Sequence, residues 1–167
     1  ILITEEINSF RHNLLYEIIN SGNDLIFFID VSKKTDNLQK LKHHLTKKRG
    51  FYILIMVIKR IFSSKEKTYR IGSLIKDYQI FKTEEPYSKI SINQIKKIKP
   101  DVLVNISGFG RLIKKSILSI PKHGVLSFHH GDMRKYRGQP AGFWELFNYE
   151  REMMITVQIL SEKLDAG

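Results

Sequence analysis

The stretch Asp101-Val102-Leu103-Val104-Asn105-Ile106 reads as the clearest strand in the chain, and the turn Ser107-Gly108-Phe109-Gly110 follows it. A second run, Leu25-Ile26-Phe27-Phe28-Ile29, is apolar at every position. Strands that are apolar on both faces belong to sheets that are covered on both sides. The two runs therefore predict a buried sheet with helices above and below it.

Further strands and helices alternate along the chain. The apolar spacing predicts strands over residues 1–3, 79–81, 124–129 and 154–160, and helices over residues 5–20, 35–62, 90–98, 112–118 and 139–147. This alternation predicts an α/β fold with a doubly wound, mostly parallel, Rossmann-like sheet. We expect residues 1–167 to form a single domain. In its last helix, Phe143 and Phe147 are expected in the core, and Trp144 in the core or at a pocket edge.

Composition limits the classes of protein to which the chain can belong. It has 167 residues, 42% of them hydrophobic, and no cysteine, which excludes disulfide frameworks and thiolate metal sites. The absence of cysteine fits a reducing compartment, and we expect a cytoplasmic location. The longest apolar stretch, Phe51 to Ile58, is shorter than the ~20 residues of a membrane span. It predicts a buried helix, with an interfacial helix as the alternative.

The net charge of +11 is compatible with nucleic acid or an anionic membrane surface. The lysines are scattered in pairs along the chain rather than gathered in one segment. A nucleic-acid partner is therefore kept as a rival hypothesis, and it predicts one clustered positive face with salt-dependent affinity.

Polar residues gather between Ser127 and Pro140, directly after the strand predicted over residues 124–129. Residues two apart on a strand share a face, so Ser127 and His129 are expected to point the same way. Ligands of open α/β sheets bind at the carboxyl ends of the strands. The segment is therefore the candidate site.

Several residues of this segment have two interpretations. His130 and Asp132 contact a substrate or are polar residues of the loop, and Arg137 contacts a substrate or holds the loop through backbone carbonyls. A His-His-x-Asp cluster suggests a metal. Adjacent histidines on a strand point to opposite faces, however, so we expect no metal site.

The same segment resembles the signature of the folate-dependent formyltransferases, which include enzymes acting on methionyl-tRNA, glycinamide ribonucleotide and amino sugars. Their signature has an Asn, any residue and a His on a strand, then a loop that ends in Arg-Gly and a Pro. Lys135-Tyr136-Arg137-Gly138 is nearest to the sugar N-formyltransferases. Leu164-Asp165-Ala166-Gly167 resembles the downstream Asp-Ala/Thr-Gly motif, and Phe109-Gly110-Arg111-Leu112 resembles the loop lining the pterin pocket.

The resemblance implies transfer of a formyl group from 10-formyltetrahydrofolate, the co-substrate, to the primary amine of a small molecule. An amino sugar or sugar nucleotide is the expected acceptor. It also implies roles for individual residues. The implied catalytic residues are His129, Asp165 and Ser127; those contacting the folate are Phe109, Gly110, Arg111, Leu112 and Leu164; those contacting the acceptor are His130, Asp132 and Arg137.

Three departures from the family pattern bear on these roles. Ser127 stands where the family has Asn, and its hydroxyl is a shorter donor than an amide. Gly131-Asp132-Met133-Arg134 stands where the family commonly has Ser-Leu-Leu-Pro. Thr4-Glu5-Glu6-Ile7-Asn8-Ser9 lacks the glycines of a phosphate loop, which disfavours glycinamide ribonucleotide as the substrate.

These departures leave alternatives open. One is an enzyme acting on methionyl-tRNA, and another is a non-catalytic folate- or sugar-binding homologue that has lost the catalytic Asn. The chain ends two residues after Asp165, so we expect it to be a fragment of a longer enzyme. A homodimer is also left open.

Overall fold

The computed structural model describes residues 1–32, 67–107, 113–136 and 142–162. Their eight strands are β1 (Leu2–Thr4), β2 (Glu6–Asn8), β3 (Ile26–Asp30), β4 (Thr68–Arg70), β5 (Gln79–Thr83), β6 (Leu103–Asn105), β7 (Val125–His130) and β8 (Ile155–Ile159). The helices are α1 (Ser9–Ile19), α4 (Gly72–Ile75), α5 (Lys89–Ile98), α6 (Lys115–Leu118) and α7 (Phe143–Phe147). The helix predicted over residues 35–62, including Phe51 to Ile58, lies outside the described residues.

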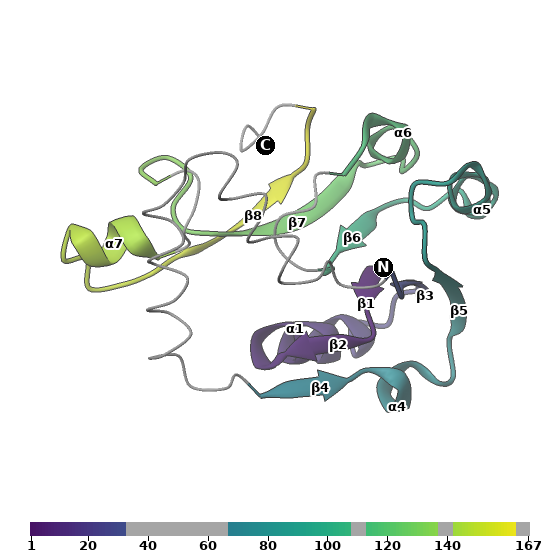
Figure 1. Cartoon of the computed structure of the whole chain (residues 1–167), viewed down its shortest axis with the longest axis horizontal. Helices are drawn as coiled ribbons and strands as arrows, with labels where there is room; N and C mark the ends of the chain where they lie inside the picture. The colour runs from purple at the N-terminus through teal and green to yellow at the C-terminus, as the bar shows by residue number, and fades with distance from the viewer. Residues whose placement is uncertain (33–66, 108–112, 137–141, 163–167) are drawn as a thin grey trace, which may run out of the picture.

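Six strands form the main sheet in the order β5-β3-β1-β6-β7-β8 (Figure 1). The first five run parallel, and β8 pairs antiparallel with β7. From β1 the chain passes outward to β3 and β5, then returns to the other side of β1 for β6 and β7. The predicted α/β sheet is confirmed, and its switch point lies between β1 and β6, where open sheets bind ligands.

Helices cover both faces of this sheet (Figure 1). On one face, α1 and α4 enclose a core that includes Ile3, Phe27 and Ile106. On the other, α5 and α6 enclose a second core that includes Leu103 and Val125. Because alternate residues of a strand point to opposite faces, the apolar runs of the central strands supply both cores.

The helix predicted over residues 5–20 begins later than expected. Residues Glu6–Asn8 form strand β2, which pairs antiparallel with β4. The helix starts at Ser9 because Asn8 caps it, with the Asn8 Oδ1 accepting a hydrogen bond from the Arg11 backbone N–H at 3.1 Å. Ile7, expected on the helix, is buried from the strand instead.

No helix within these described ranges has the length and apolar character needed to cross a lipid bilayer.

Candidate functional site

On the sheet face that carries the second core, polar residues replace apolar ones toward the carboxyl edge of the sheet. Leu103 of β6 and Val125 of β7 are register partners and are buried in the same cluster. Two residues further along, the partners are Asn105 and Ser127. Since residues two apart on a strand share a face, Asn105, Ser127 and then His129 follow this apolar pair on one face.

His129 and His130 point to opposite faces of β7. The Phe10 ring of α1 lies 6.1 Å from the His130 ring and 6.4 Å from the Phe128 ring, between centroids. His130 therefore shares the α1 face with Phe128, whereas His129 shares the other face with Ser127. The His129 Nε2 and His130 Nδ1 atoms are both shielded from solvent.

The loop after β7 is shaped by Asp132 and Arg134. Asp132 Oδ1 accepts hydrogen bonds from the Arg134 backbone N–H and Nε, both at 3.0 Å, and its Oδ2 lies 2.9 Å from Arg134 Nη2. The side-chain bonds from Arg134, followed by the backbone bond, lower the pKa of the Asp132 carboxyl to about 2. Both carboxylate oxygens are therefore engaged within the loop itself.

The loop is also tied to the segment after α7. The Tyr136 hydroxyl donates to Glu150 Oε1 at 2.8 Å, and Lys135 Nζ lies 3.5 Å from the same oxygen. The bond to Glu150 raises the pKa of Tyr136, and the bond from Tyr136 lowers the pKa of Glu150. Residues before and after α7 are thus held as one unit.

Helix α7 corrects the expectation that Phe143 and Phe147 lie in the core. Phe143, Trp144 and Phe147 are 38%, 44% and 65% exposed, and their rings contact one another. The helix turns Glu145 inward, leaving it 6% exposed. Spacing on a helix indicates which residues share a face, but not which face is covered.

Glu145 lies directly beneath the loop after β7. Gly131 has φ of 114°, and a Cβ added there would lie 2.8 Å from Glu145 Oε1. Within the described residues that oxygen is buried without a hydrogen-bond partner. Gly131 is fixed from the other side, where its N–H donates to the Met154 carbonyl and its carbonyl accepts from the Thr156 hydroxyl. Glu145 was not selected from the sequence, because apolar residues flank it.

Several predicted site residues lie outside the described ranges. They are Phe109, Gly110, Arg111, Leu112, Arg137, Leu164 and Asp165. The roles that the resemblance implies for them stay predictions. Among the predicted residues that the structure describes, it brings Ser127 and His129 together on one face and places His130 on the other.

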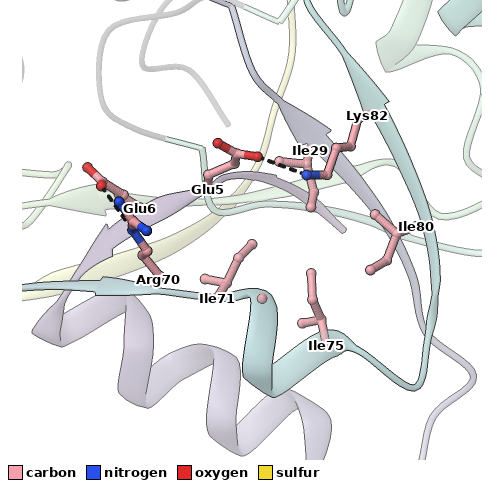
Figure 2. Close-up of a pocket in the computed structure, with 9 residues that line it drawn as sticks. Glu5, Glu6, Ile29, Arg70, Ile71, Ile75, Ile80 and Lys82 are labelled. Carbon is pink, nitrogen blue, oxygen red and sulfur yellow. Dashed lines mark hydrogen bonds and ion pairs between the residues drawn. The ribbon is translucent and has the colours of Figure 1, made fainter.

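A separate pocket, of about 410 Å³, opens near the ends of β1 and β5 (Figure 2). Its apolar lining consists of Ile29, Ile71, Ile75 and Ile80. At its edge, Glu5 pairs with Lys82 at 3.0 Å and Glu6 pairs with Arg70 at 3.7 Å. The carboxylates that follow β1 are therefore used in ion pairs with cationic side chains. Sequence spacing gave no sign of this pocket, because its residues come from distant segments.

Within the described ranges, no three His, Asp or Glu side chains gather so as to hold a metal ion.

Comparison with known proteins identifies the family. A family model described as formyl transferase matches residues 25–167. The chain belongs to this formyl transferase family. The predicted family is therefore confirmed by a match that covers most of the chain and includes β6, β7 and the loop that follows.

Relatives within the family carry the name methionyl-tRNA formyltransferase. The protein from Clostridioides difficile is 35% identical over 109 residues, which cover 65% of this chain and 34% of the relative. The protein from Geobacter sulfurreducens is 36% identical over 77 residues, covering 46% of this chain and 24% of the relative. The protein from Pelotomaculum thermopropionicum is 38% identical over 73 residues, covering 44% of this chain and 23% of the relative. The matched region thus spans about a third or less of these relatives' length.

Proposed function

We propose that the protein transfers a formyl group from 10-formyltetrahydrofolate to a primary amine. The observation that carries this proposal is the row of Asn105, Ser127 and His129 at the carboxyl edge, beside the switch point of a formyl transferase family sheet. Donors on one face of a sheet edge suit a reaction in which charge develops on a carbonyl oxygen.

In this reaction the amine nitrogen attacks the formyl carbon, and a tetrahedral intermediate forms with negative charge on oxygen. Its collapse breaks the bond to N10 of the folate, which takes up a proton while the amine loses one. The products are the formylated amine and tetrahydrofolate. His129 is assigned as a donor to the oxygen and Asp165 as the residue that orients it, as the family resemblance implies.

The observations that bear on the acceptor favour two different molecules. The relatives are named for methionyl-tRNA, and the chain carries a net charge of +11, which suits a polyanionic substrate. The sequence favoured an amino sugar because of Lys135-Tyr136-Arg137-Gly138, a choice that the relatives do not support. We therefore place methionyl-tRNA first and an amino sugar second.

Three further predictions accompany this proposal. We retain one catalytic domain over residues 1–167 and a cytoplasmic location. A homodimer is kept as a prediction that sedimentation of the whole protein would test.

The test measures tetrahydrofolate release and product formylation by the whole protein. One arm supplies 10-formyltetrahydrofolate with methionyl-tRNA, and the other supplies it with a nucleotide-linked amino sugar. We expect turnover in the first arm. The His129→Ala variant should have a kcat lower by about 10²-fold or more. The matched control is His123→Ala, since His123 is exposed in the turn before β7. Folate binding without turnover in either arm would support the non-catalytic alternative.

A further inference from the structure

Asn105 occupies the position on β6 that faces the site beside Ser127. The two residues are register partners, and the pair before them, Leu103 and Val125, is buried in one cluster. The Asn105 side chain therefore lies on the face that carries Ser127 and His129. On this face the sheet changes from an apolar pair to a polar pair just before its carboxyl edge.

Hydrogen bonds to Ser107 fix how the Asn105 amide is turned. Asn105 Oδ1 accepts from the Ser107 backbone N–H at 3.2 Å and from the Ser107 hydroxyl at 2.6 Å. The Ser107 N–H is shared with the Leu2 carbonyl at 3.1 Å, but a backbone N–H only donates, so the amide atom that faces it must be the oxygen. The amide NH₂ is therefore directed away from these bonds, with its hydrogens available to another acceptor.

Ser107 follows β6 at its carboxyl end, so its bonds to Asn105 Oδ1 hold the amide at that edge of the sheet. Ser107 is two residues beyond Asn105, which is the last residue of β6. An amide held by its oxygen is a donor whose orientation is set before a substrate binds. Such preorganised donors stabilise a developing oxyanion most effectively.

Packing gives no reason for an Asn at this position. Asn is disfavoured in strands, and β6 lies inside the sheet between β1 and β7. A half-buried amide there is costly unless its donors and acceptor are used. Its oxygen is used by Ser107, which leaves the NH₂ for a ligand.

We infer that Asn105 supplies the amide donor that stabilises the oxyanion of the formyl-transfer intermediate, in the place left by the shorter Ser127 side chain. This inference rests on the proposed formyl transfer. It assigns a catalytic contact to a residue one strand away from the position at which the family signature has its Asn.

The test separates the donor from the turn that Asn105 makes with Ser107. Asn105→Asp keeps the oxygen that accepts from Ser107 but removes the NH₂ group. We expect its kcat for transfer to fall by about 10²–10³-fold, with KM and the Kd of a 10-formyltetrahydrofolate analogue changed by less than about threefold. Ser116→Ala, at an exposed position of α6, is the control and should leave kcat unchanged, whereas Ser127→Ala is expected to lose less than about tenfold.

A rescue experiment provides the second readout. Asn105→Ala should lose kcat to a similar extent, and the double variant Asn105→Ala/Ser127→Asn should regain at least about tenfold, because the amide returns on the neighbouring strand. Full activity in Asn105→Asp, or a large loss in Ser127→Ala alone, would overturn the inference but leave formyl transfer standing. A wild-type protein that neither binds the analogue nor transfers formyl would overturn both.

Discussion

The region formed by β1, α1 and β3 differs from the region around β7 and α7 in what it buries. In the first, Ile3, Leu15 and Phe27 are fully buried, as their apolar patterns predicted. In the second, Asp132 and Glu145 are buried while Phe143 and Phe147 are exposed. Asp132 is paired with Arg134, whereas the buried Glu145 Oε1 has no hydrogen-bond partner among the described residues. Burial of an unpaired acidic group is costly, so it indicates a region shaped by something other than core packing.

Apolar spacing on a helix therefore predicts burial in one region and not in the other. In the first region, the sheet covers the apolar face of α1, and apolar spacing therefore predicts burial. In the second, the turn between Gly131 and Tyr136 lies over α7 and brings Glu145 against the backbone. Substitutions in the two regions should therefore differ in their cost to stability, with the largest cost in the core of the first region.

Phe27→Ala should produce the largest loss. The side chain is fully buried and its ring lies 5.4 Å from the Tyr78 ring, so its removal leaves a cavity in the core beside α1. We expect the free energy of unfolding to fall by about 3–5 kcal/mol in urea denaturation. A loss below about 1 kcal/mol would mean that this region is no better packed than α7.

Gly131→Ala should be next. Its φ of 114° disfavours any side chain, and the new Cβ would meet Glu145 Oε1. We expect a loss of about 1–3 kcal/mol by thermal unfolding. Gly22→Ala is the matched control, because Gly22 also has a positive φ but nothing lies within 4 Å of the added carbon. Equal losses in the two variants would show that Glu145 does not restrict Gly131.

Asn8→Ala tests the boundary between β2 and α1. Loss of the hydrogen bond to the Arg11 N–H should cost about 1 kcal/mol of unfolding free energy. Asn13→Ala, at an exposed position within the same helix, serves as the control and should not destabilise the protein. If both variants behave alike, the cap does not determine where α1 begins.

Acidification should affect the loop after β7 locally. The pKa of Asp132 is lowered to about 2, below its ordinary value of 3.8. Its interaction with Arg134 therefore contributes fully to stability when the pH is above about 4, the range in which the carboxyl is ionised in both the folded and the unfolded state. This contribution is lost as the pH falls from about 4 toward 2. Titration of the Asp132 carboxyl by NMR measures it, and Arg134→Ala should return the pKa toward its ordinary value.

Phe147→Ala should have the smallest effect. The side chain is 65% exposed, and its removal uncovers little buried surface. We expect a change within about 0.5 kcal/mol in the same denaturation assay used for Phe27→Ala. A cost approaching that of Phe27→Ala would show that the aromatic face of α7 is covered in solution.

The family, the α/β class and most strands could be predicted from the sequence, because they depend on local apolar runs and on short motifs around His129 and Arg137. Strand β3 and helix α5 were predictable within one residue, since periodicity and the Pro100 that follows α5 are local signals. The start of α1 was placed too early, because strand β2 forms only by pairing with the distant β4.

Which residues meet at the candidate site depends on contacts between distant segments, which the sequence does not reveal. Asn105 and Ser127 are register partners across two strands, a relation set by the pairing of β6 with β7 and absent from local spacing. The inward orientation of Glu145 depends likewise on the loop that lies over α7. Local patterns specify faces and periods, whereas the choice of which face is covered and which strands adjoin depends on contacts between distant segments.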